Sequence, residues 1–172
     1  MREALFLLEG DGLVEFKPHK GAVVRPLSIK EVAELFRLRA LLECDLLRQA
    51  LPHMTEADFD RAEKALADYD RAVASGRNIA RWFRLNWLFH AAIYGPADTP
   101  ITLDMVKSLH DNTDRYQRIQ MTLDGARPRA HNEHQELLQA CRDRHDGKAV
   151  KLLERHLLEG GRRVTDFLEN AN

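Results

Sequence analysis

The sequence predicts an all-α protein, an antiparallel bundle of six helices preceded by one short helix and a β-hairpin. Three observations predict this class. From residue 28 onward apolar residues recur with a helical period, capping residues and prolines delimit each periodic segment, and no strand pattern interrupts them. Helices joined by such short connections pack against one another in antiparallel order.

The composition is typical of one globular domain with a small appendage. A chain of 172 residues that is 44% hydrophobic can bury a substantial core. The 26 basic and 27 acidic residues give a net charge of −1, so any contact with DNA must be local. Cys44 and Cys141 lie in apolar helical patterns, as buried thiols of a reducing cytoplasm do. Without a membrane-length apolar run or a signal-peptide pattern, the chain is expected to be cytoplasmic, with no membrane partner.

Residues 28–172 contain the six helical segments and are predicted to form one domain. Ser28 and Glu31 have the spacing of a capping box at the start of the first helix, and Pro52 ends it. Thr55 opens the second, with Asp58 in its first turn. The other boundaries are Ser75-Gly76 after the second helix, Asn78 and Gly95-Pro96 around the third, Asp98 or Thr99 with Pro100 and about Leu123 around the fourth, and Pro128 and Asp146 near the starts of the fifth and sixth.

Residues 1–27 differ in kind. The segment 2–9 has a helical pattern that ends at Gly10, and the alternating segments 13–17 and 22–25 predict a hairpin. A helix followed by a hairpin with a basic tip is typical of the back half of a winged helix-turn-helix, whose front half is absent from the sequence. Pro26 marks the linker to the bundle.

Three of the eight histidines fall on the inward stripes of three different helices, and they suggest a metal site. His90, His134 and His156 are each aligned with apolar residues, and Asn86 lies one turn before His90 on the same face. Three imidazoles and one oxygen suit Zn²⁺ or another late first-row divalent ion. Alternatively, they are hydrogen-bonded core residues. The remaining histidines fall at turns or polar positions and are expected to be solvated, although one of them, His131, could add a further donor: His19, His53, His110, His131 and His145.

Arginines within the helical pattern suggest an anion site. Arg39 lies among apolar residues of the first bundle helix, and Arg115 and Arg118 bracket Tyr116 on the fourth. A guanidinium group presents a fork that suits a carboxylate, so Arg39, Arg115 and Tyr116 are candidates for binding a small organic acid beside the metal. The alternative for each arginine is an ordinary salt bridge, for example from Arg39 to Glu43 at i+4.

The motifs resemble those of a known family. The segments Arg2-Glu-Ala-Leu, residues 8–14 (LEGDGLV) and residues 18–24 (PHKGAVV) resemble the recognition helix and wing of GntR-type transcription regulators. Residues 35–43 (LFRLRALLE), Asn86-Trp-Leu-Phe-His90, Glu133-His134 and Arg155-His156-Leu157 resemble the FadR-type C-terminal (FCD) domain. Six helices rather than seven make this domain similar to the VanR subgroup. The resemblance covers essentially the whole chain.

The resemblance implies a dimeric bacterial repressor or activator whose helical domain binds a divalent metal and a small carboxylate effector. The metal ligands of the family correspond here to Asn86, His90, His134 and His156. Aspartate is commoner than asparagine at the first of these positions, and the neutral amide implies weaker metal binding. Zinc is the expected metal, and nickel and manganese are the alternatives.

The resemblance also implies contacts with operator DNA. Arg2 resembles a DNA-contacting arginine of the recognition helix, and Lys17, Lys20 and Gly21 resemble the wing tip. The first helices of the family head would precede Met1. We therefore expect residues 1–25 to be poorly packed or to pack on a partner's surface. We also expect this chain alone to bind operator DNA weakly or not at all, in contrast to a full-length form.

Two other functions stay open at this point. A helical-bundle metalloenzyme would need a general acid or base beside the metal. Glu133 points about 100° away from His134 on an ideal helix, and no His-Glu-x-x-His motif occurs, so we expect no enzymatic activity. The second is a dimerisation module without metal, whose histidines are core residues.

Overall fold

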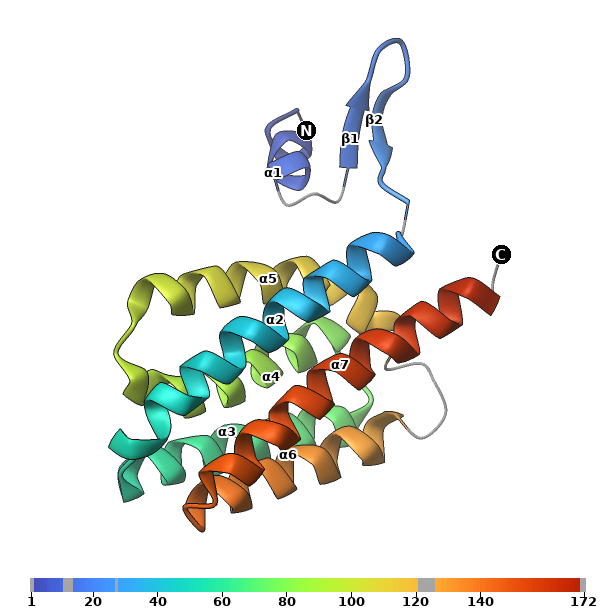
Figure 1. The fold of residues 1–172 in the computed structure, drawn as a ribbon. Coiled ribbons are helices and arrows are strands. Elements are labelled where there is room, and N and C mark those ends of the chain that lie inside the picture. Colours follow the sequence, from blue (N-terminus) through green and yellow to red (C-terminus); the bar gives the residue numbers. More distant parts are fainter. Residues whose placement is uncertain (1, 11–13, 27, 121–125, 171–172) are drawn as a thin grey trace.

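Six antiparallel helices form the body of the molecule, and a small N-terminal unit lies beside them, above α5 and the start of α2 in the view of Figure 1. The computed structural model describes residues 2–10, 14–26, 28–120 and 126–170, except the side chains of residues 115, 117, 119, 120, 126 and 127. The bundle helices are α2 (Ile29–Ala50), α3 (Glu56–Ser75), α4 (Ile79–Tyr94), α5 (Pro100–Gln120), α6 (Ala126–Arg142) and α7 (Asp146–Asn170). Short 3₁₀ turns, η1 (Leu51–His53) and η2 (Gly95–Ala97), follow α2 and α4. None of the described helices is both long and apolar enough to cross a lipid bilayer.

Capping side chains start these helices where the sequence predicts. Ser28 Oγ accepts a hydrogen bond from the N–H of Glu31 at the start of α2. Thr55 and Asp58 form a reciprocal capping box at the start of α3, and Asn78 caps α4. These bonds satisfy backbone N–H groups that have no partner within the helix.

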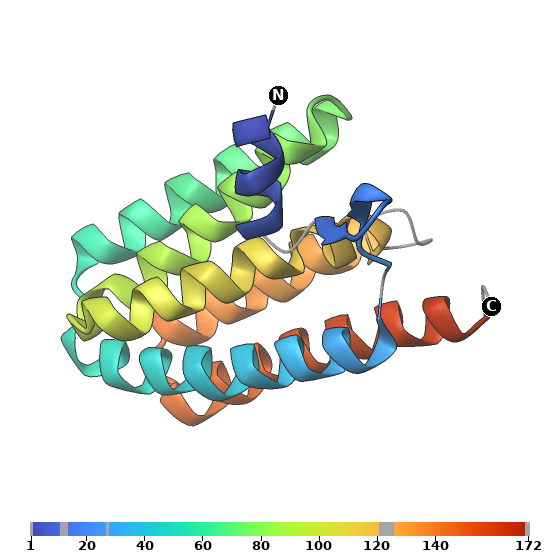
Figure 2. The same ribbon diagram turned by 90° about the horizontal axis from the view of Figure 1, so that it is seen from above.

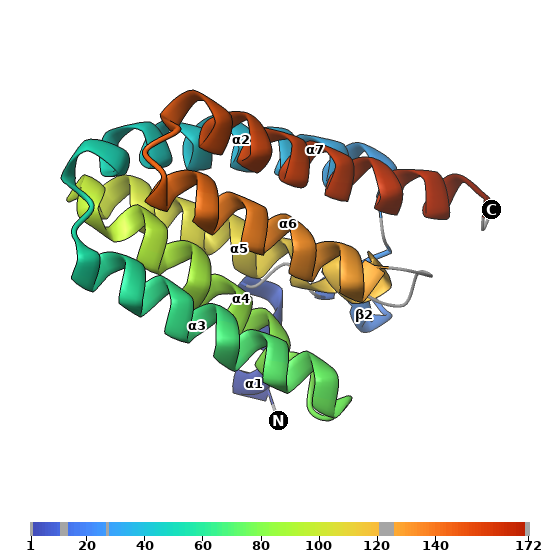
Figure 3. The same ribbon diagram turned by 90° about the horizontal axis from the view of Figure 1, so that it is seen from below.

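The bundle helices close a ring around a common core. Along the ring, α2 packs against α7, α7 against α6, α6 against α3, α3 against α4, α4 against α5, and α5 against α2. Views from above and below show that neighbouring helices run in opposite directions (Figures 2 and 3). The largest fully buried apolar side chains include Trp82, Tyr94, Phe59 and Phe89, and polar side chains such as Arg39 are buried among them.

A glycine allows α2 and α7 to approach closely. A Cβ atom added at Gly161 of α7 would lie 2.7 Å from Cβ of Phe36 on α2, which is closer than real Cβ atoms come. The contact lies beside the cavity described below, which Phe36 and Gly160 both line. The crossing of these two helices therefore depends on the missing side chain.

The N-terminal unit is thinly packed, as expected. It consists of α1 (Arg2–Gly10), β1 (Val14–Lys17) and β2 (Gly21–Val24), and the two strands pair in antiparallel order. The observed strands agree with the predicted segments 13–17 and 22–25 to within one residue; Leu13 lies outside the described residues. The rings of Phe6 and Phe16 contact each other in a tilted arrangement, with 5.4 Å between centroids, but Phe6 and Leu7 remain 57% and 71% exposed. Within the described part of this unit, Val14 is the only buried residue.

Candidate metal and effector site

Three imidazole rings meet inside the ring of helices. His90 lies on α4, His134 on α6 and His156 on α7, and one ring nitrogen of each lies within 4.8 Å of the others. His90 and His134 are fully buried, and His156 is largely buried. The helical stripes on which the sequence places these residues thus face one volume.

Hydrogen bonds fix the His90 ring with one free nitrogen directed inward. Its Nδ1 lies 3.1 Å from the hydroxyl oxygen of Tyr94, and that hydroxyl donates to Glu43 Oε2 at 2.7 Å. Since the Tyr94 proton is used toward Glu43, Nδ1 of His90 must donate, and the lone pair is on Nε2. Nε2 is buried without a partner among the described residues.

A carboxylate orients His156 in the same way. Glu133 Oε2 lies 2.6 Å from Nδ1 of His156, which places the proton on Nδ1 and the lone pair on Nε2. Burial alone would raise the pKa of Glu133, but the hydrogen bond and charge interaction with His156, together with the nearby Arg163 and Arg129, lower it. The sequence prediction gave Glu133 no role, because it considered only the angle to His134. That same angle directs Glu133 toward α7.

His134 supplies the strongest indication of a ligand. Both of its ring nitrogens are buried without a partner among the described residues. Burial, together with the neighbouring His156, lowers the pKa of His134 well below its ordinary value, so the ring is neutral. Leaving a buried polar group unsatisfied costs about 1–3 kcal/mol. A divalent metal ion would satisfy Nε2 of His90 and one of the two ring nitrogens of His134, and neutral imidazoles are donors that zinc and nickel accept.

A cavity of about 40 Å³ adjoins these rings. Its polar lining comes from Arg39, Asn86, His134 and His156. Asn86 is 9% exposed and lies one turn before His90 on α4, so the structure brings together all four predicted metal ligands. Aromatic side chains form much of the remaining wall, together with Ala130, Leu157 and Gly160; the aromatic residues are Phe36, Tyr69, Trp82 and Phe83.

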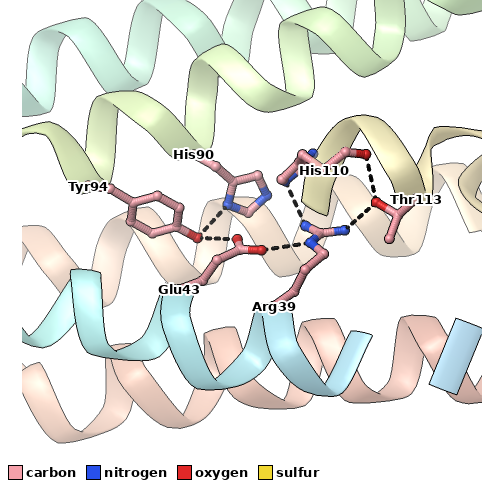
Figure 4. A network of polar contacts seen from close by, with 6 residues as sticks. All are labelled: Arg39, Glu43, His90, Tyr94, His110 and Thr113. Carbon is pink, nitrogen blue, oxygen red and sulfur yellow. Dashed lines mark hydrogen bonds and ion pairs between the residues drawn. The ribbon is translucent and has the colours of Figure 1, made fainter. Parts of the chain in front are cut away.

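Arg39 is the centre of a buried polar network that joins three helices (Figure 4). Its Nε lies 2.7 Å from Glu43 Oε1, so the predicted i+4 salt bridge is present. Its Nη1 donates to Thr113 Oγ1 at 3.1 Å, and its Nη2 donates to His110 Nε2 at 2.6 Å. Through Glu43 and Tyr94 the network continues to His90.

The solvated position expected for His110 is wrong. His110 is 1% exposed, and burial, followed by the nearby Arg39, lowers its pKa well below the ordinary value. Val106, His110 and Thr113 are spaced as i, i+4 and i+7, so they form an inward stripe of α5 in which two members are polar. A search for helical spacing that counts polar as well as apolar residues would have found this stripe. The other histidines expected at the surface are exposed there: His19, His53, His131, which pairs with Asp70, and His145.

Tyr116, another predicted effector residue, lies apart from the lining of the cavity. Tyr116 is buried beside Val32, Phe36 and Val164, and its hydroxyl accepts a hydrogen bond from the N–H of Ser28 at 3.3 Å. It is not among the described residues that line the cavity. The side chain of Arg115 on α5 lies outside the described part of the chain. Of the two candidates whose side chains the structure describes, Arg39 lies at the cavity and Tyr116 does not.

The predicted DNA-contacting residues are exposed. Lys17, Lys20 and Gly21 lie together at the hairpin turn, where Gly21 has a φ of 71° that favours glycine. Lys17 also pairs with Glu15 at 2.8 Å. Arg2 lies separately, at the start of α1.

Comparison with known proteins identifies the bundle. The family profile described as the FCD domain matches residues 34–159. This chain belongs to the FCD domain family. The family resemblance of the sequence motifs is thereby confirmed.

The relatives of this FCD-domain chain are named as transcription regulators. It is 26% identical to the HTH-type regulator BphR of Paraburkholderia xenovorans over 91% of its own length and 66% of that protein. It is 27% identical to the HTH-type repressor RspR of Escherichia coli over 92% of its length and 69% of that protein. The chain thus spans about two thirds of these relatives. Their names, and the family, are those of regulators rather than enzymes.

Solved structures agree with this assignment. A GntR-family regulator from Pseudomonas syringae is 27% identical, with a TM-score of 0.67 over 98% of this chain and 70% of that one. Escherichia coli McbR/YncC superposes with a TM-score of 0.80 over 98% of this chain and 84% of that one, and at 19% identity it shows the fold alone.

Proposed function

We propose that this FCD domain senses a small carboxylate through a bound divalent metal ion, as the effector-binding part of a homodimeric transcription regulator that binds operator DNA. The observation that carries the proposal is the group of three buried imidazoles, in which His90 and His134 have ring nitrogens without a partner among the described residues. A buried group of neutral donors with an adjoining cavity is what a metal-dependent ligand site requires.

Four side chains would hold the ion: Asn86, His90, His134 and His156. A metal so bound supplies positive charge and open coordination positions for a carboxylate oxygen. Zinc fits three nitrogens and one oxygen, and nickel or manganese can occupy the same donors. The surrounding chain holds the rings in place, because Glu133 fixes His156 and Tyr94 fixes His90.

Arg39 would contribute to binding of the acid. It lines the cavity, and the contacts with Glu43, Thr113 and His110 use three of its five N–H groups. A carboxylate bound beside Arg39 would influence the position of α2, because Arg39 and Glu43 both belong to that helix. The chain enters α2 directly from the hairpin, and the Ser28 N–H at this junction is bonded to Tyr116 of α5. An effector that favours one arrangement of α2 would therefore act on the orientation of the DNA-contacting unit.

Thermal unfolding tests the proposal. Zinc added to metal-free protein should raise the melting temperature, and one acid from a panel of small carboxylates should raise it further. The His134→Ala variant should lose both shifts. The His131→Ala variant is the matched control, because His131 lies one turn earlier on α6 and is exposed. Equal responses of the two variants would contradict the proposed site.

A further inference from the structure

The carboxylates next to the three histidines each have an arginine beside them. Two carboxylates contact the histidine shell, Glu43 through Tyr94 and Glu133 directly. Glu43 is paired with Arg39 at 2.7 Å, and Glu133 lies 3.9 Å from Nη2 of Arg163, whose Nη1 also pairs with Glu159 at 3.4 Å. Each of these carboxylates therefore already faces an arginine.

The other helices contribute neutral side chains and two aspartates that interact with groups of their own. From α3 comes Tyr69, whose pKa burial raises, and from α5 comes His110, which is buried and neutral. Asp70 of α3 is paired with the exposed His131. Burial, followed by the neighbouring Asp111, raises the pKa of Asp114 on α5 to about 6, although Arg118, Lys107 and Arg39 act in the opposite direction.

The donor set itself is also neutral. It consists of imidazoles and the amide of Asn86, and among the described residues that line the cavity none is acidic. A divalent ion at this position would bring two positive charges into an interior where His90 and His134 are no more than 1% exposed. Buried charge is unfavourable unless an opposite charge accompanies it.

We propose that Asn86 makes metal binding at this site depend on a small anion from solution, so that metal and anion bind as a charge-balanced pair. The inference rests on the proposed metal site and specifies its regulation. The cavity of about 40 Å³ beside Asn86 and Arg39 offers room for a group the size of a carboxylate. By linkage, the anion and the metal raise each other's affinity by the same factor. An aspartate at position 86 would supply the missing negative charge and remove this dependence.

Zinc titration by calorimetry tests the inference, in a sulfonate buffer without halide, with and without acetate as the probe. Acetate should raise the zinc affinity of the wild-type chain about tenfold or more, within the usual range of linked binding. The Asn86→Asp variant should bind zinc tightly without acetate and gain less than about threefold from it. Asn132→Asp, which adds the same charge on the exposed face of α6, should behave as the wild type.

The outcomes separate the inference from the function on which it rests. Wild-type zinc binding that is the same with and without acetate overturns the inference and leaves the metal site intact. Absence of zinc binding under both conditions overturns the metal site and the inference together. The wild-type comparison decides the matter even if the aspartate variant fails to fold, which circular dichroism would show.

Discussion

Oε2 of Glu133 on α6 lies 2.6 Å from Nδ1 of His156 on α7. This contact orients one histidine of the site from the helix that carries another, because His134 follows Glu133 in the chain. A carboxylate behind a histidine ligand fixes the tautomer of the ring and makes it a better donor.

Replacing this carboxylate should weaken metal binding without removing a ligand. For Glu133→Gln we expect zinc affinity to fall about 10- to 100-fold, because the amide neither fixes the proton on Nδ1 nor adds negative charge. Glu136→Gln, in an exposed ion pair with Arg155, is the control and should leave the affinity unchanged. Competition with a chromophoric chelator measures the zinc affinity of both variants. Similar affinities for the two variants would contradict the orienting role of Glu133.

The buried pair of Arg39 and Glu43 should be strongly interdependent. Arg39→Met leaves the Glu43 carboxylate buried without its cation, which we expect to cost about 3–5 kcal/mol of stability. Adding Glu43→Gln should recover a substantial part of this loss. The exposed pair of Lys107 and Asp111 is the comparison, and its disruption should cost no more than about 1 kcal/mol. Urea denaturation gives these values, and additive effects at positions 39 and 43 would disprove the interdependence.

Gly161→Ala should destabilise the bundle. The added Cβ would lie 2.7 Å from Cβ of Phe36, an atom next to the backbone of α2, so the helices must separate. Overpacking of this kind costs about 1–3 kcal/mol. Gly147→Ala, also in α7, meets nothing within 4 Å and should be neutral or slightly stabilising. Melting curves of the two variants test this, and equal stability would mean that α2 and α7 do not need the close approach.

Acid should destabilise the metal-free protein through its buried histidines. Burial lowers the pKa of His90, His110 and His134 well below 6.5 in the folded chain. Below that pH the unfolded chain binds more protons, so stability is fully present above about pH 6.5 and falls as the pH decreases toward the folded pKa values. The slope should approach about 1.4 kcal/mol per pH unit for each histidine. Urea unfolding between about pH 5 and pH 8 measures it. A profile that is flat below pH 6.5 would show that these rings are not held neutral.

The sequence predicts the helices well because local chemistry sets their ends. Ser28, Thr55 and Asn78 are capping residues, and their hydrogen bonds depend on the next few residues alone. The inward positions of His90 and His134 could be predicted from the sequence for a similar reason, since each residue lies on an apolar stripe of its own helix.

Contacts between helices were harder to predict. His110 lies on a stripe of α5 that is polar in sequence, and its burial depends on Arg39, which is 71 residues away. The role of Glu133 requires knowing that α7 lies beside α6. Tyr116 was assigned to the effector site by its arginine neighbours, whereas its inward face meets the start of α2. Helical periodicity gives the face of a residue but not which helix packs against that face.

The metal content of the purified protein tests the central claim most directly. Elemental mass spectrometry should find about one equivalent of a divalent metal per chain after exposure to zinc and acetate, followed by gel filtration in acetate buffer. The His134→Ala variant should lose this metal, and His131→Ala should retain it. Metal that is absent from the wild-type protein, or retained by His134→Ala, would contradict the account and leave the three imidazoles as residues of the core.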